Sequence, residues 1–254
     1  MTAADQGPQA RIVPFFLLTT GLTLPFWALG AWVQFEPLPG LPASSLMAFC
    51  PAAAALILAA RAGGGRATRA LAARSFDVAR LRGRWPWLAV TLLMPALAGA
   101  AWLLQRQAGL LGEPQPGAMI APLMMLAVFF VAALGEELGW SGYILEPMRE
   151  RWGETAAALA IGIFWAAWHI LPFLQADRAP EWIAWQCAKT VAVRVVMVRL
   201  YFGAGRSVFA VALFHALSNV AAFWLPFVGA QYDARLGALT MIPAAIALTL
   251  ANRR

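Results

Sequence analysis

Two adjacent carboxylates, Glu136 and Glu137, stand at the end of the apolar run 118–134 in this 254-residue chain. A charge at the centre of a bilayer costs roughly 2.5–3.5 kcal/mol on insertion scales, so an acid inside a membrane segment is a candidate for a function. The other interpretation is a helix that ends in a solvated acidic cap. Apolar and aromatic residues resume at Trp140, which favours acids that lie within the membrane.

The chain has only two histidines, His169 and His215, and both lie inside apolar segments. Histidine and carboxylate are the pair that proteins use for general acid–base catalysis and for binding zinc-like metals. Asn219 follows His215 by one helical turn on the same face, where its amide can orient the imidazole or donate to a developing oxyanion. One such histidine is more often a hydrogen-bonded core residue, but two of them with two acids favour catalysis.

The composition indicates how these residues are positioned. The chain is 61% hydrophobic, its mean hydropathy is +0.68, and only 12% of its residues are charged, about half the globular average. We therefore predict an all-α, polytopic transmembrane bundle that forms a single integral membrane domain over residues 1–254. Apolar runs of about 20 residues give about eight spans, at 12–35, 41–60, 85–104, 118–145, 155–172, 181–201, 207–228 and 234–251.

The distribution of positive charge predicts the orientation. The connection 61–84 holds seven arginines against the single acid Asp77, and the positive-inside rule puts it in the cytoplasm. Both termini are then cytoplasmic, in a multi-pass protein of the plasma membrane. The net charge of +7 reflects this rule, so we expect a lipid bilayer as partner and no nucleic acid. Segment 61–84 is the candidate flexible connection; residues 69–82 could instead form a basic amphipathic helix on anionic lipid.

Depth in the membrane tests whether the polar residues can meet. If the helix of span 118–145 continues past the acids to about Leu145, stopping before Pro147, Glu136 lies roughly 15 Å from its cytoplasmic end. His169 then lies at about 21 Å and His215 at about 12 Å, so the three can meet near mid-membrane. Helical spacing puts Glu136 on the face of Trp140 and Tyr143, and Glu137 on the face of Ser141 and Ile144. We expect Glu136 to face both histidines and Glu137 to lie on a neighbouring face.

Three ordered motifs carry a resemblance to a known family. Residues 136–142 read Glu-Glu-Leu-Gly-Trp-Ser-Gly, residues 165–169 read Trp-Ala-Ala-Trp-His, and residues 215–219 read His-Ala-Leu-Ser-Asn. Together they resemble the type II CAAX prenyl endopeptidase and bacteriocin-processing family, often called CPBP or Abi-like intramembrane proteases. The resemblance covers 118–222, which would be the catalytic core. Trp165 stands where the family usually has phenylalanine.

The resemblance implies an intramembrane endopeptidase that hydrolyses a peptide bond of a membrane-associated protein or peptide. Glu136 and His169 would activate the water, His215 and Asn219 would stabilise the oxyanion, and Glu137 would complete the site. A metal is optional: Glu136, His169 and His215 could ligate Zn²⁺ with the water as fourth ligand. The oligomeric state is left open.

One departure from the family motif concerns Ser141, which stands where the family has arginine. If that arginine anchors the glutamate helix, another cation must replace it, and Arg194 and Lys189 inside span 181–201 are the candidates. Their other interpretation is snorkelling of long side chains to an interface.

Other functions remain open at this point. A non-catalytic membrane protein of the same fold, acting in bacteriocin immunity or as a scaffold, is the main alternative. A cation-coupled carrier would be expected to show an internal repeat with broken helices, and none is found. Residues 139–142 also fit the Gly-x-Ser-Gly motif of a rhomboid-type serine protease, but rhomboids have their His/Asn helix before the serine.

Overall fold

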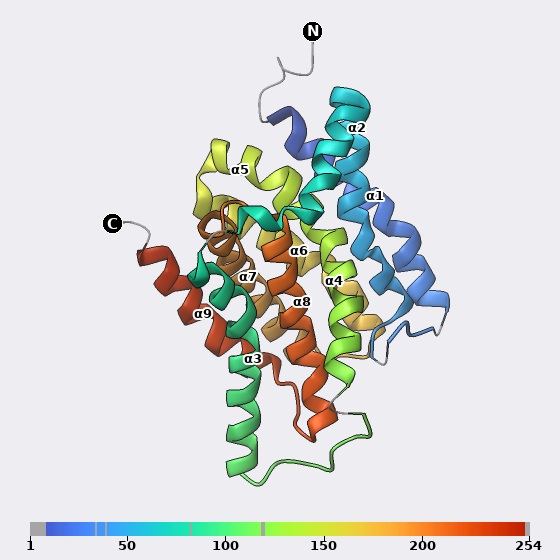
Figure 1. Ribbon diagram of the computed structural model, residues 1–254. Helices are drawn as coiled ribbons and strands as arrows, with labels where there is room; N and C mark the ends of the chain where they lie inside the picture. Colours follow the sequence, from blue (N-terminus) through green and yellow to red (C-terminus); the bar gives the residue numbers. More distant parts are fainter. Residues whose placement is uncertain (1–8, 34, 39, 82, 118–119, 252–254) are drawn as a thin grey trace.

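The structure is a computed structural model that describes residues 9–33, 35–38, 40–81, 83–117 and 120–251. It is a bundle of long helices that run up and down between two ends (Figure 1). In chain order the helices are α1 (Gln9–Trp32), α2 (Cys50–Ala72), α3 (Arg84–Gln107), α4 (Ala121–Gly139), α5 (Leu145–Trp152), α6 (Glu154–Gln175), α7 (Pro180–Gly203), α8 (Val208–Trp224) and α9 (Ala234–Ala251).

The all-α multi-pass architecture predicted from the sequence is confirmed. Within the described residues, seven helical segments are long and apolar enough to cross a membrane. The remaining predicted span, 181–201, corresponds to α7, which is of similar length but carries Lys189, Arg194 and Arg199. Residues 118 and 119, at the start of the fourth predicted span, and both chain ends lie outside the described residues.

The helix that carries the glutamates does continue past them, as the depth argument requires. A π-helical turn, Trp140–Ile144, joins α4 to α5, and the continuous segment ends only at Trp152. The expected stop before Pro147 is therefore wrong. In a π turn an N–H bonds the carbonyl five residues earlier, and proline has no N–H to offer Gly142. The carbonyl of Gly142 accepts instead from Arg74 Nη1, at 2.7 Å.

Two glycines let the preceding segment lie directly against α4. A Cβ added to Gly135 would lie 2.8 Å from the carbonyl oxygen of Ala48, and one added to Gly139 would lie 2.6 Å from the backbone of Pro51. These distances are shorter than van der Waals contact, so only glycine permits this crossing of α4 with the start of α2. Small residues spaced four apart serve this purpose in membrane bundles.

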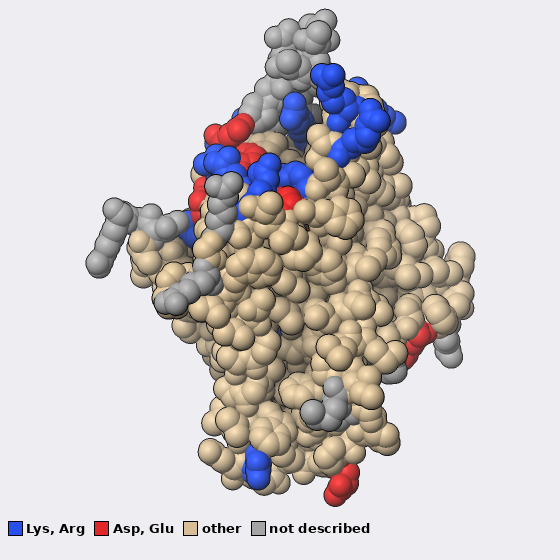
Figure 2. Space-filling view, viewed as in Figure 1, with Lys and Arg blue, Asp and Glu red and all other residues tan. Residues whose placement is uncertain are grey.

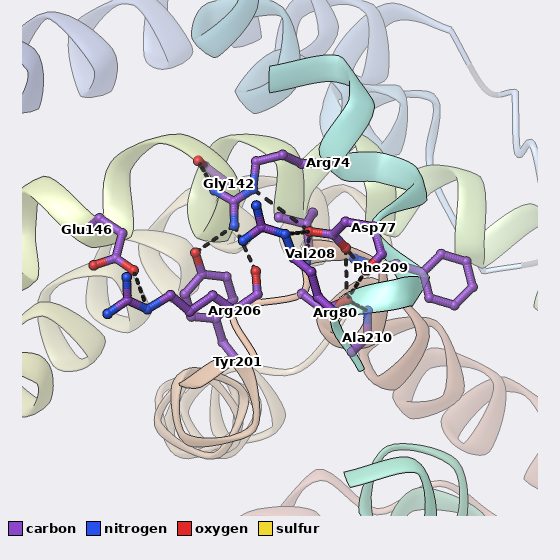
Figure 3. Close-up of polar contacts among 11 residues, drawn as sticks. Arg74, Asp77, Arg80, Gly142, Glu146, Tyr201, Arg206, Val208, Phe209 and Ala210 are labelled. Atoms are coloured by element: carbon purple, nitrogen blue, oxygen red, sulfur yellow. Dashed lines mark hydrogen bonds and ion pairs between the residues drawn. The ribbon is translucent and has the colours of Figure 1, made fainter. Parts of the chain in front are cut away.

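Segment 61–84 is largely helical and contacts the bundle through Arg74, so the interpretation as a flexible connection is wrong, while contact of its arginines with anionic lipid stays a prediction. α2 bends at Gly63 and Gly64 and continues as helix to Ala72. Arg74 then donates to Tyr201 Oη and to the carbonyl of Arg206, at 2.7 and 2.8 Å (Figure 3). Polar groups at the ends of α4, α7 and α8 were available to satisfy these arginines, so the segment is held by the protein itself.

Asp77 closes the beginning of α8. Its carboxylate accepts from the Ser207 hydroxyl at 2.8 Å and from the backbone N–H groups of Val208 and Phe209 (Figure 3). The first N–H groups of a helix have no partner within the helix, and a carboxylate there also complements the helix dipole. We call Arg74, Asp77 and the groups they bind the connection cluster.

Charge is separated along the bundle. In the face that Figure 2 shows, Lys and Arg gather at the end occupied by α5 and segment 61–84, and most of the surface between the two ends carries no charge. Large apolar side chains such as Leu17, Leu123 and Met124 are exposed on the helices, each at 68–71%. This surface suits a hydrocarbon environment.

Candidate active site

Among the described residues, Glu137 is the most enclosed acid. Its side chain is fully buried, and each of its two oxygens accepts from an Arg194 guanidinium nitrogen at 2.8 Å. The Ser141 hydroxyl donates to Oε2 at 2.5 Å. This two-pronged geometry is the strongest form of a carboxylate–guanidinium contact.

Arg194 therefore supplies the cation that position 141 lacks. Its side chain is 1% exposed, lies over the ring of Trp165 at 4.4 Å, and reaches the Ser141 hydroxyl at 3.5 Å. Gly162 on α6 gives it room, because an added Cβ would lie 3.2 Å from the Arg194 Cβ. Snorkelling is thus wrong for Arg194. Lys189, the other candidate, donates elsewhere, to Tyr232 Oη at 2.9 Å.

Glu136 is held by tryptophans. Its Oε2 accepts from the indole N–H of Trp165 at 2.5 Å and from that of Trp140 at 3.4 Å. The side chain is 5% exposed. Glu136 and Trp140 share a face of the helix, as the spacing predicts. Both indoles donate to Oε2 and so fix the direction of the carboxylate, and neither indole binds Oε1.

His169 has a defined tautomer. Its Nδ1 lies 2.8 Å from the carbonyl oxygen of Trp165, and because a carbonyl can only accept, Nδ1 carries the proton. Nε2 of the neutral ring then holds a lone pair. The rings of Trp165, Trp168 and Phe173 surround the imidazole, with centroids 4.9–5.7 Å away. Glu136 lies within electrostatic range of His169.

His215 contacts the other acid. Its Nδ1 lies 3.2 Å from Glu137 Oε1, and its ring packs edge to face on Trp165 with centroids 5.0 Å apart. The expectation that Glu136 faces both histidines, with Glu137 elsewhere, is therefore wrong for His215. The histidines come from α6 and α8, and successive glutamates point about 100° apart, so each acid faces a different helix. Asn219 lies half-buried one turn further along α8.

Trp165 is the site residue that sequence reasoning missed. It binds Glu136 through its indole N–H, His169 through its carbonyl, and Arg194 and His215 through its ring. The sequence did hold a signal: tryptophan replaces the usual phenylalanine at this position, and only tryptophan brings a hydrogen-bond donor.

The proposed zinc ligands do not converge in this arrangement. Within the described residues, no group of three His, Cys, Asp or Glu side chains has the spacing to hold a metal ion. The indoles of Trp165 and Trp140 bind one oxygen of Glu136, and the Nδ1 atoms of His169 and His215 lie against protein oxygens, which leaves Nε2 of each ring as the nitrogen that could face a metal. Zinc therefore enters no step below, and its presence stays a prediction for metal analysis.

Comparisons with known proteins agree with the resemblance seen in the motifs. Residues 118–221 match the family "Type II CAAX prenyl endopeptidase Rce1-like". CAAX prenyl protease 2 of Methanococcus maripaludis is 28% identical over an alignment of 172 residues that covers 61% of this chain. The chain spans 60% of the length of that relative.

The matched region holds all three motifs and every side chain of the candidate active site. Over residues 118–221 the chain is similar to the Rce1-like type II CAAX prenyl endopeptidase family. The family recognition made from the motifs is confirmed.

Proposed function

We propose that this protein is an intramembrane endopeptidase whose water is activated by Glu136 and His169. The observation that carries the proposal is the position of Trp165, which fixes the Glu136 carboxylate with its indole N–H and His169 with its carbonyl. Both groups present one unprotonated atom, Glu136 Oε1 and His169 Nε2. A water between them can lose its proton as it attacks a peptide carbonyl.

The second half of the site serves the oxyanion. His215 directs Nδ1 at the Glu137 carboxylate, so its Nε2 can donate to substrate when the ring is protonated. Glu137 supports that protonated form, while Arg194 balances the carboxylate. Asn219 adds an amide donor one turn away.

The atoms balance without a co-reactant. Water oxygen bonds the carbonyl carbon, and its proton passes to the Glu136–His169 pair. The carbon–nitrogen bond then breaks, and that proton passes to the leaving amine. One water is consumed and two peptide ends are released.

The family suggests substrates that are membrane-associated. The site opens toward the cytoplasm if the basic end of the bundle is inside, as the positive-inside rule favours. A prenylated peptide ending in Cys-aliphatic-aliphatic-X is one substrate class, suggested by the relative's name. An unmodified membrane peptide is the other.

Incorporation of ¹⁸O tests the proposal directly. The purified full chain in lipid nanodiscs would be incubated in H₂¹⁸O with each peptide class, and the new C-terminus analysed by mass spectrometry. We expect ¹⁸O in the wild-type product and no labelled product with Glu136→Gln. Glu150 is an exposed acid near the end of the same helical segment, and Glu150→Gln should keep full activity.

The mutant also separates the alternatives. A non-catalytic scaffold of the same fold would keep its phenotype in Glu136→Gln and cleave neither peptide. Cleavage that persists in Glu136→Gln would overturn the assignment of the base. Metal analysis of wild type beside His169→Ala and His215→Ala tests zinc: stoichiometric zinc that both variants lose would replace the mechanism above.

A further inference from the structure

A cavity of about 150 Å³ lies among α3, α8 and α9, outside the candidate active site. A single water needs about 10–15 Å³, so the space suits a much larger guest. Most of its walls are apolar side chains, such as Leu97, Leu104, Leu225 and Met241.

Lys189 lines this cavity and is the only lysine of the chain. Its side chain is nine-tenths buried, and its ammonium donates to Tyr232 Oη at 2.9 Å. Among the described residues, no carboxylate oxygen lies within 4.0 Å of Nζ. Asp233 also lines the cavity, but its Oδ1 caps α9 by accepting from the N–H groups of Arg235 and Leu236.

The surroundings keep the ammonium in place. Tyr232 Oη donates to Gln186 Oε1 at 2.6 Å, so its oxygen lone pairs point at the lysine. Gly237 on α9 gives the lysine stem room, because an added Cβ would lie 3.1 Å from the Lys189 Cδ. A buried cation with one neutral partner is costly, since burial of charge is normally compensated by an opposite charge.

Hydrogen bonds join α3 to the segment before α9 at the edge of the cavity, which is partly open. Gln105 at the end of α3 and Gln231 before α9 exchange two hydrogen bonds, at 2.8 and 2.9 Å. Trp102 donates to the carbonyl of Val228 at 3.2 Å. The cavity is therefore mostly apolar, with the ammonium group of Lys189 in its wall.

We propose that this cavity binds an amphiphile that places a carboxylate or phosphate against Lys189 and its alkyl chain along the apolar walls. The anion supplies the missing opposite charge, and the chain fills space that water would occupy unfavourably. A free fatty acid and an anionic phospholipid share this chemistry. The site does not depend on the proposed hydrolysis, because none of the proposed catalytic residues lines it.

Thermal unfolding of the purified full chain with decanoate or decanol tests the proposal, because a ligand that binds the folded state raises Tm. We expect decanoate to raise Tm more than decanol does. Lys189→Met, which keeps the length of the stem, should bind decanoate about tenfold or more weakly, since hydrogen bonds to charged groups are strong. Arg235→Met is the matched control. Arg235 lies on the first turn of α9, next to the wall residue Leu236 but outside the cavity wall, so the preference for decanoate over decanol should remain in this variant.

Labelling of the wild type avoids dependence on variants. An amine-reactive acetylating reagent can modify only Lys189 and the chain's amino terminus, so mass spectrometry reads the lysine directly. Decanoate should slow acetylation of Lys189 at least several-fold, and decanol should not. Equal effects of decanoate and decanol, or a carboxylate preference that survives in Lys189→Met, would overturn the proposal.

The source of the anion is read from what the purified protein retains. Lipid extraction after purification, compared between wild type and Lys189→Met, should show either a fatty acid or an anionic phospholipid enriched in the wild type only. The same lipid content in both proteins would contradict an anion site at Lys189.

Discussion

The molecule holds two arginine–carboxylate clusters that differ in what the arginine does. In the active site, Arg194 binds both oxygens of Glu137, and both side chains are at most 1% exposed. In the connection cluster, Arg74 Nε lies 3.9 Å from Asp77 Oδ2. The shorter contacts of both side chains are to other groups, mainly backbone carbonyls and N–H groups.

The difference shows two uses of the same residue types. Removing one partner of a buried pair leaves an unpaired charge away from water, which costs several kcal/mol. In the connection cluster the side chains of Arg74 and Asp77 are 19% and 8% exposed and mainly contact backbone groups, so we expect the removal of a partner to cost about as much as the loss of a helix cap. The inner pair therefore fixes the site's electrostatics, and the outer cluster joins the ends of α4, α7 and α8.

The largest effect is expected from breaking the inner pair. Arg194→Met leaves Glu137 buried without its cation and should lower the free energy of unfolding by about 3–5 kcal/mol. Chemical unfolding in detergent micelles measures this. Arg199→Met on the same helix is the control, because Arg199 pairs with Glu154, whose side chain is 23% exposed, and the change should cost about 1 kcal/mol or less. Equal losses in the two variants would contradict the special role of Arg194.

Moving the cation back to position 141 sharpens the comparison. Ser141→Arg, which restores the family's residue, would place a second guanidinium in a space that Arg194 already fills, so folded protein should be lost. The double variant Ser141→Arg with Arg194→Met should recover a substantial part of the stability. A double-mutant cycle of unfolding free energies measures the coupling. Additive losses would mean that the two positions do not exchange roles.

An intermediate effect is expected at Trp165. Trp165→Phe, again the residue usual in the family, keeps an aromatic ring beside Arg194 but removes the N–H that binds Glu136. The lost bond to a charged group is worth about 1.5–3 kcal/mol, so kcat should fall roughly tenfold to a hundredfold with little change in KM. Trp168→Phe, which loses an N–H bond to Thr23 outside the acids, is the control for tryptophan removal. A kcat that is equal in both variants would remove Trp165 from the site.

The smallest effect is expected in the connection cluster. Asp77→Ala removes the cap of α8 and should cost about 0.5–2 kcal/mol. Limited proteolysis should then cut segment 61–84 faster than in the wild type, whereas Glu150→Ala, an exposed acid at the same end, should leave the rate unchanged. An unaltered cleavage rate in Asp77→Ala would show that other contacts hold the segment.

The sequence predicted what depends on local pattern. Apolar runs and their lengths predicted the spans, and the spacing of Glu136, His169 and His215 predicted that they could meet. Side-chain pairing between helices was harder to predict from the sequence. Arg194 could have snorkelled to an interface or replaced the motif arginine, and the position of the neighbouring helices decides between these two roles. The assignment of faces failed because the sequence pattern does not tell on which side of α4 each of the two histidine helices lies.

The connection 61–84 shows the other limit. Seven arginines in a loop predict solvation or lipid contact when only the loop is considered. Their partners include the carbonyl of Gly142, which is left open by the π turn before Pro147. Nothing in the local pattern of 61–84 reports an acceptor on a distant helix.

The cap that Asp77 supplies also bears on the order in which the chain can assemble. Asp77 and Ser207 are 130 positions apart, so the beginning of α8 cannot be completed until four further long helices have been synthesised. His215 lies on the same helix, α8. Glu137 therefore gains its contacts with Arg194 and His215 only after α7 and α8 have been synthesised. A nascent chain that stops short of α8 already contains Arg194 but lacks His215 and Asn219, so no partly made product can have a complete site.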